Sequence, residues 1–258
     1  MAIHVLGLDA TPAEYVDGMV ELFRGVRRAL RPDGTLWLNL GDSYAGSWGN
    51  QGRKEERGTQ RAIKGGMIQQ FHNGGHRIDC DLDEDCTCSL DRYPAKASNT
   101  GKIPKGSGLK PKDLCGIPWR VALALQADGW WLRADIIWHK PSCMPSSVKD
   151  RPTTSHEYLF LLTRSARYYY DAEAIREPDS DGGSRNKRSV WRIATVPFPG
   201  SHFAVMPPGL VEPCIKAGSR PGDLVLDPFS GAATVGLVAC RLQRRYLGLE
   251  LNADYCEM

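Results

Sequence analysis

Residues 223–252 read DLVLDPFSGAATVGLVACRLQRRYLGLELN, and they carry the strongest indication of the fold. A short apolar run over residues 224–226 ends at an acid, and a tight turn containing proline and glycine follows it. Apolar residues at helical spacing then occupy residues 235–242, and a second short apolar run, residues 246–249, also ends at an acid. The pattern predicts a β-α-β unit with a carboxylate at the carboxyl end of each strand.

The two acids are Asp227 and Glu250, and open α/β sheets bind ligands at this edge of their strands. Glu250 lies about 20 residues past the turn, where nucleotide-binding folds place a carboxylate for ribose hydroxyls. Gly231 in the turn lets a ligand approach the backbone, because no Cβ intervenes. A generic β-α-β unit with solvated acids also fits this stretch, since the GxGxxG fingerprint is absent.

Three segments resemble motifs of the DNA amino-methyltransferases, the enzymes that methylate N4 of cytosine or N6 of adenine. Residues 227–231 (DPFSG) resemble their S-adenosylmethionine-binding motif, and residues 250–252 (ELN) resemble the motif whose acid holds the cofactor ribose. Residues 200–208 (GSHFAVMPP) resemble a third cofactor motif. The resemblance implies S-adenosylmethionine as cofactor, with a site made of His202, Phe203, Asp227, Pro228, Phe229, Ser230, Gly231, Thr234, Glu250 and Asn252.

The order of these motifs resembles the permuted class of the family, in which the cofactor half follows the catalytic half. The resemblance covers the chain from about residue 8 to residue 258, which we interpret as a single domain with a variable insert over residues 46–112. It implies a Rossmann-like α/β sheet, mostly parallel with an antiparallel edge. The glycine loop departs from the family pattern Gly-x-Gly-Thr-Thr, because this chain has Ala233 and Val235 at the third and fifth positions.

Other elements follow from the same periodicities. Residues 11–14 (TPAE) form a capping box that opens a helix, and an apolar stripe continues this helix to Leu30. Residues 131–138 and 156–163 are apolar strands joined without a helix, which is typical of an antiparallel pair. A further strand is expected over residues 35–40 and a further helix over residues 114–127.

Length, charge and composition limit the class of protein but do not identify its function. The 258 residues suffice for one α/β domain with an insert, and a net charge of +3 allows a local basic face without requiring a nucleic-acid partner. No apolar run reaches the roughly 18 residues that span a bilayer, and the N-terminus has no signal-peptide pattern. Scattered cysteines suit a reduced cytoplasm. We expect a cytoplasmic protein, and the resemblance implies a bacterial or phage origin.

Two polar regions are candidates for contacts with double-stranded DNA. The insert carries lysines spaced by glycine, proline and serine, and residues 171–198 are basic and lie where the family has target-recognition segments. A solvated surface loop is the alternative interpretation of each region. The DNA-binding candidates are Lys105, Lys110, His139, Lys140, Lys149, Arg151, Arg185, Lys187 and Arg188.

The insert also holds a group of metal-ligand residue types: His72, His76, Cys80, Cys86 and Cys88. Thiolates and imidazoles so close in sequence are compatible with a structural zinc ion. Their spacing, however, lacks the paired Cys-x2-Cys of zinc ribbons. We therefore expect no metal site, with these residues as the alternative.

The family's catalytic loop, (Ser/Asp/Asn)-Pro-Pro-aromatic, has no counterpart in this sequence. In relatives it is expected upstream of residues 6–8, so we expect a sheet that lacks one or two central strands and a chain with little activity alone. Asp42 and Tyr44 follow a strand and are the catalytic candidates that the chain itself offers. The sequence thus predicts a site-specific DNA methyltransferase. The alternatives are a non-catalytic DNA-binding or complex-forming subunit and a methyltransferase acting on RNA or a small molecule.

Overall fold

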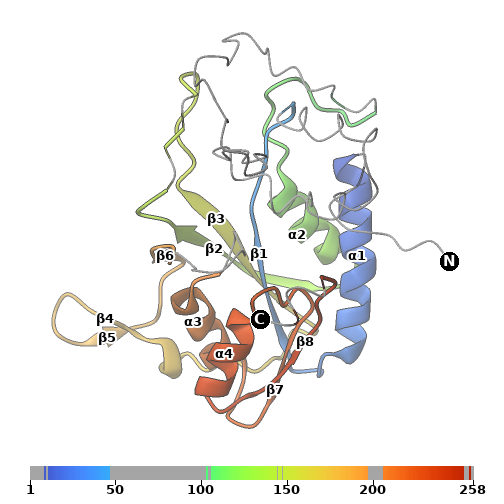
Figure 1. The fold of residues 1–258 in the computed structure, drawn as a ribbon. Coiled ribbons are helices and arrows are strands. Elements are labelled where there is room, and N and C mark those ends of the chain that lie inside the picture. Colours follow the sequence, from blue (N-terminus) through green and yellow to red (C-terminus); the bar gives the residue numbers. More distant parts are fainter. Residues whose placement is uncertain are drawn as a thin grey trace, which may run out of the picture. The chain divides into compact units, whose positions relative to one another are not determined.

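A computed structural model describes Asp9, Ile103, Cys256 and residues 11–46, 106–143, 145–146, 148–196 and 206–252 (Figure 1). The chain divides into two compact units. The first comprises residues 1–15 and 43–115, and the second comprises residues 16–42 and 116–258. Most of the insert predicted over residues 46–112 lies outside the described residues, so the architecture below is that of the second unit.

The larger sheet of the second unit has four strands in the order β1-β3-β2-β6. They are β1 (Thr35–Leu40), β3 (His156–Thr163), β2 (Trp131–His139) and β6 (Val190–Arg192). β3 runs antiparallel to both of its neighbours, and β6 runs parallel to β2. The predicted antiparallel pair is confirmed, although β3 occupies an inner position because β1 pairs with its second edge.

The predicted β-α-β unit is also present. β7 (Leu224–Asp227) and β8 (Arg245–Gly248) pair in parallel, and α4 (Thr234–Arg241) connects them. Each of these elements begins and ends within one residue of its predicted position. The two strands form a separate sheet, which places Asp227 at its carboxyl end and Glu250 two residues beyond β8.

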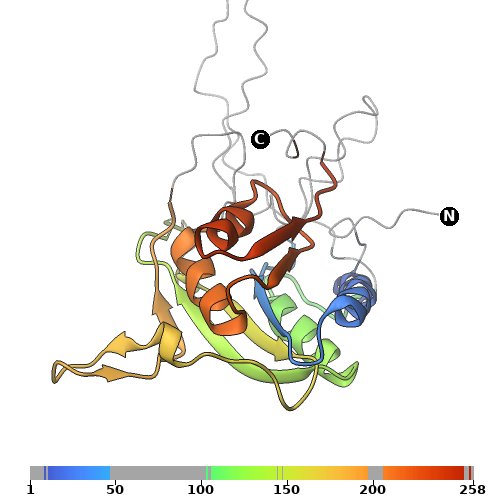
Figure 2. The same ribbon diagram turned by 90° about the horizontal axis from the view of Figure 1, so that it is seen from below.

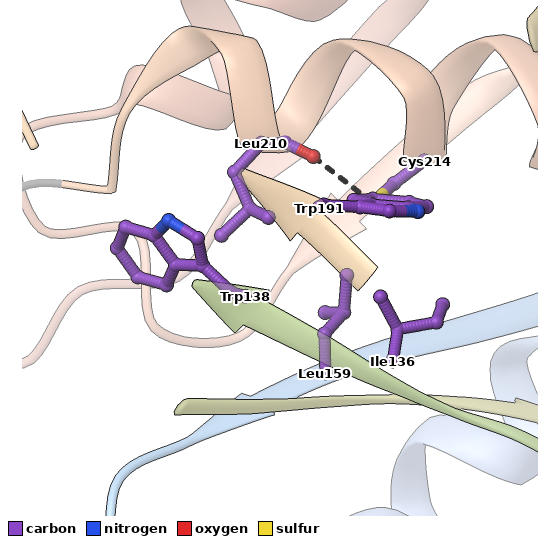
Figure 3. Close-up of a cluster of buried hydrophobic side chains, with 6 residues drawn as sticks. All are labelled: Ile136, Trp138, Leu159, Trp191, Leu210 and Cys214. Carbon is purple, nitrogen blue, oxygen red and sulfur yellow. Dashed lines mark hydrogen bonds between the residues drawn. The ribbon is translucent and has the colours of Figure 1, made fainter. Parts of the chain in front are cut away.

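Helix α3 (Pro208–Gly218) joins the two sheets through two apolar clusters. One side of α3 contributes Leu210 and Cys214 to a buried cluster with Ile136, Trp138, Leu159 and Trp191 of the larger sheet (Figure 3). The other side contributes Val211 and Ile215 to a cluster with Val238 and Ala239 of α4. At its C-terminus α3 lies so close to β1 that a Cβ on Gly218 would be 2.4 Å from Thr35 Oγ1.

Two helices precede strands of the larger sheet. α1 (Pro12–Ala29) begins as predicted, because Thr11 Oγ1 accepts a hydrogen bond from Glu14 N at 3.2 Å. α2 (Ile117–Ala127) begins three residues later than predicted, because Gly116 adopts a left-handed conformation with φ of 69° immediately before it. Trp119 of α2 packs edge-on against Tyr158 and Phe160 of β3, on the sheet face opposite α3.

A short hairpin extends from the rest of the second unit in both views (Figures 1 and 2). It consists of β4 (Glu177–Pro178) and β5 (Ser184–Arg185), and the 3-10 helix η3 (Glu173–Ile175) precedes it. This hairpin, named the arm below, lies within the predicted target-recognition region of residues 171–198.

The edge strand β1 of the larger sheet and strand β7 of the smaller sheet are not hydrogen-bonded to each other. Arg31 contacts Asp223 at 3.9 Å and Arg220 contacts Asp33 at 3.9 Å, so β1 and β7 begin side by side. Among the described residues, however, β1 pairs only with β3 and β7 only with β8. The described helices include none that is both long and apolar enough to cross a membrane.

Candidate functional site

The turn after β7 is held by the two predicted carboxylates. Asp227 Oδ1 accepts a hydrogen bond from Phe229 N at 3.0 Å. Glu250 Oε2 accepts one from Gly231 N at 2.7 Å, and its Oε1 accepts one from Asn252 N at 2.8 Å. The acids therefore bracket the glycine turn from neighbouring strands, so two of the three segments that resemble cofactor motifs, residues 227–231 and 250–252, meet at one point of the sheet edge.

A contact between two hydroxyl groups, those of Ser230 and Tyr246, also stabilises this turn. Ser230 Oγ lies 2.8 Å from the Tyr246 hydroxyl, and Ser230 N donates to Leu249 O at 3.0 Å. Burial raises the pKa of the Tyr246 phenol, and the nearby charges of Asp227 and Glu250 add to the rise. Tyr246 was not among the predicted site residues. It lies in the predicted strand of residues 246–249, and an apolar strand pattern gives no sign of a polar partner.

The other predicted cofactor residues that the structure describes lie around this turn. Pro228 follows Asp227 directly, the Phe229 side chain is 45% exposed, and Thr234 is the first residue of α4. Gly231 has a positive φ of 50°, which explains a glycine at this position. His202 and Phe203 lie outside the described residues.

The electrostatics of the site favour a ligand that offers hydroxyl or cationic groups. Burial raises the pKa of the Asp227 carboxyl, and the charge of Glu250 raises it further, against the hydrogen bond from Phe229. Two adjacent carboxylates attract a positive charge and accept hydrogen bonds from hydroxyls or ammonium groups. S-adenosylmethionine carries all of these groups, so the donor set fits it.

Ala233 gives a first prediction, because it stands where the family pattern has glycine. It is in the left-handed region, with φ of 55°, immediately before α4. This conformation costs an L-residue about 1–2 kcal/mol. We expect Ala233→Gly to stabilise the protein against urea by about 1 kcal/mol, which is the relief of that strain less the added chain entropy. Ala232→Gly is the matched control, since Ala232 has no positive φ, and it should be neutral or destabilising. Equal changes in the free energy of unfolding for the two variants would show that the backbone at Ala233 is not strained.

Most of the predicted DNA-contacting cations have partners within the protein. Lys110 lies 3.0 Å from Asp113, and Lys140 pairs with Glu157 while its Nζ lies 4.2 Å from the Trp138 ring centre. Arg185 at the end of the arm and Arg188 just after it both contact Glu177, at 3.0 and 2.6 Å, and they lower its pKa. These ion pairs stabilise the local structure, and a DNA-binding role for their lysines and arginines stays a prediction.

The other candidates are placed as follows. Lys187 lies 5.0 Å over the Trp191 ring, and His139 lies opposite His156 across β2 and β3. Lys149 and Arg151 belong to the loop between β2 and β3. Lys105 lies outside the described residues.

The catalytic candidates have structural positions of their own. Asp42 Oδ1 accepts a hydrogen bond from Ile117 N at 3.1 Å and so caps the start of α2, while Tyr44 forms an isolated bridge with Leu114. The five residues of the zinc alternative, from His72 to Cys88, lie outside the described part of the chain. Within the described part, no three His, Cys, Asp or Glu side chains are grouped as metal ligands.

Comparison with known proteins identifies the family. A family model described as DNA methylase matches residues 7–258. The type II methyltransferase M.SmaI of Serratia marcescens is 45% identical over 255 residues, covering 98% of this chain and 75% of the relative. M.Cfr9I of Citrobacter freundii is 45% identical over 253 residues, covering 98% of this chain and 72% of the relative.

A solved structure agrees on the fold. The PvuII DNA methyltransferase (cytosine-N4-specific) superposes with a TM-score of 0.62 at 18% identity, covering 98% of this chain and 74% of that chain. The motifs, the fold and the relatives point the same way. The chain therefore belongs to the DNA methylase family, the S-adenosylmethionine-dependent methyltransferases that its motifs resemble.

Proposed function

We propose that this protein is the methyltransferase of a type II restriction–modification system. It would transfer a methyl group from S-adenosylmethionine to an exocyclic amine of double-stranded DNA, N4 of cytosine or N6 of adenine. One observation carries the cofactor part of the proposal: Asp227 and Glu250 bracket the Gly231 turn at the carboxyl ends of two neighbouring parallel strands. The bacterial cytoplasm, where such DNA lies, is the proposed location.

The residues of the turn have distinct tasks in this proposal. Glu250 accepts hydrogen bonds from the ribose hydroxyls, as the family motif implies, while continuing to hold the turn through Gly231 N. Asp227 supplies negative charge beside the cationic cofactor. Phe229, which is half exposed, offers a ring to the flat adenine. Bound S-adenosylmethionine supplies an activated sulfonium methyl group, and the residues act by positioning it.

The target amine requires a second set of groups. A base inside a duplex is unreachable, so it must be flipped into a pocket that accepts hydrogen bonds from its amine. The 258 residues contain no Pro-Pro-aromatic loop to do this. Among the described residues, β1 and β7 each keep one edge without a strand partner. We infer that a strand placed between these edges, ending in such a loop, completes the catalytic site, and that this chain alone transfers methyl groups slowly.

The decisive experiment measures two properties of the purified chain. We expect calorimetry to detect S-adenosylmethionine binding, and we expect little transfer of labelled methyl to unmethylated DNA. Robust transfer would disprove the low activity and direct mutagenesis to Asp42 and Tyr44. Absence of cofactor binding would contradict the proposed function itself. Nucleoside analysis of any product separates N4-methylcytosine from N6-methyladenine.

The missing loop also favours one alternative, a non-catalytic DNA-binding or complex-forming subunit. The two proposals differ in the coding sequence upstream of residue 1. An in-frame segment resembling Ser-Pro-Pro-Tyr would favour the enzyme, and its absence would favour the non-catalytic subunit.

A further inference from the structure

Three side chains form a row across the carboxyl edge of the larger sheet. His156 begins β3, His139 ends β2, and Arg192 ends β6. The strand registers pair His139 with His156 on one side and with Arg192 on the other. Residues paired in register point to the same face of a sheet, so the three side chains lie next to one another. Adjacent strands are about 4.8 Å apart, which gives the row a span of about 10 Å.

The face on which the row lies follows from its neighbours in the sequence. Trp138 and Trp191 are 4% exposed and pack with Leu210 and Cys214 of α3 (Figure 3). Successive residues of a strand point to opposite faces, so His139 and Arg192 face away from α3. Arg192 is exposed there, and both histidines are half-buried.

The row differs from the other candidate cations in its lack of internal partners. Arg185, Arg188 and Lys140 are paired with carboxylates of the protein. For Arg192 and the His139 ring, the described part of the chain provides no ion pair and no side-chain hydrogen bond. The His156 ring makes only an edge contact with the Tyr158 ring, at 5.4 Å between ring centres. These donors therefore remain available to a ligand.

An apolar surface adjoins the row on the same sheet face. Val190, the register partner of Ile137, is 61% exposed although it lies in a strand. Tyr158 pairs with Ile137 from the other side, and Trp119 packs against Tyr158. A line of cationic and imidazole donors beside exposed apolar and aromatic groups suits a polymer that alternates phosphates with sugars and bases.

We propose that His156, His139 and Arg192 bind the sugar–phosphate backbone of the DNA substrate. The proposal rests on the proposed function, and it assigns the backbone contact to the sheet edge instead of to Arg185 and Arg188. Arg192 neutralises a phosphate, the two imidazoles donate hydrogen bonds to phosphate oxygens, and Val190 packs against deoxyribose. None of these four residues belongs to the cofactor turn.

The test is the salt dependence of binding to an unmethylated DNA duplex, measured by fluorescence anisotropy with the full chain. Each phosphate neutralised contributes about 0.9 to the slope of log affinity against log salt. We expect Arg192→Gln to reduce the slope by about one and to weaken binding about eightfold at 0.1 M salt. Arg192→Lys should retain the slope. His139→Gln should weaken binding several-fold without changing the affinity for S-adenosylmethionine.

Arg133→Gln is the matched control. Arg133 is an exposed arginine at the other end of β2, where its Nε donates to the Tyr168 hydroxyl at 3.2 Å. This variant removes the same charge and should leave the slope unchanged. If the wild-type protein bound DNA normally and Arg192→Gln kept the wild-type slope, the proposed backbone contact of the row would be wrong, and the proposed function would stand. Failure of the wild-type protein to bind DNA would overturn the proposed function as well.

Discussion

Replacing Glu250 by alanine is expected to lower the affinity for S-adenosylmethionine at least hundredfold. The carboxylate holds Gly231 N and Asn252 N, and it is the proposed acceptor for the ribose hydroxyls. A hydrogen bond to a charged group contributes about 1.5–3 kcal/mol. Loss of two hydrogen bonds to the ribose hydroxyls amounts to about 3–6 kcal/mol, which corresponds to a factor above one hundred in the dissociation constant. Isothermal titration calorimetry measures the change directly.

Glu250→Gln is the graded control for this prediction. Glutamine keeps one oxygen that can accept from Gly231 N, but it loses the charge and presents an amide group to the second donor. We expect an affinity between those of the wild-type protein and the alanine variant. If both variants bound the cofactor as tightly as the wild type, Glu250 would have no part in the cofactor site.

Asp227 adds a measurement that separates binding from folding. Asp227→Ala should also remove cofactor binding. Because burial raises the pKa of this carboxyl in the folded state, its charged form opposes folding at neutral pH, and its contribution to stability is fully present only below the unfolded pKa. Asp227→Asn keeps the oxygen that accepts from Phe229 N but carries no charge. We therefore expect this variant to bind cofactor poorly while resisting urea better than the wild type at pH 7.

The β-α-β unit was predictable from sequence because its determinants are local. Strand length, helical spacing and the two terminal acids all lie within residues 223–252, and the observed bounds agree within one residue. The partner of Ser230 was not predictable. The Tyr246 hydroxyl reaches it only once α4 has returned the chain to the sheet.

Tertiary pairing also explains the other differences between expectation and structure. Arg185 and Arg188 form a basic run in the sequence, yet folding of the arm brings both to Glu177. β6 is three residues long inside a polar region, which is too short for a period to be seen. Its only buried residue is Trp191, which identifies it in retrospect.

Trp191→Ala is expected to destabilise the protein by about 3–5 kcal/mol, the usual cost of removing a large aromatic side chain from a core. Trp191 packs in the cluster beneath α3, lies 6.2 Å from the Trp37 ring, and donates from Nε1 to Arg188 O at 2.7 Å. It is the one buried side chain of β6, so its loss removes most of what fixes that strand. Urea unfolding followed by tryptophan-independent circular dichroism gives the free energy.

Val190→Ala is the control for this variant, because Val190 is the preceding residue of the same strand and is 61% exposed. A surface substitution of this kind changes stability by about 0.5 kcal/mol or less. If the two variants lost equal stability, Trp191 would not anchor β6.

Trp191→Ala also tests whether DNA binding and cofactor binding belong to different sheets. β6 carries Arg192, whereas the cofactor turn belongs to β7 and β8. Trp191→Ala should therefore weaken DNA binding strongly at temperatures where the protein is still folded, while the affinity for S-adenosylmethionine stays near that of the wild type.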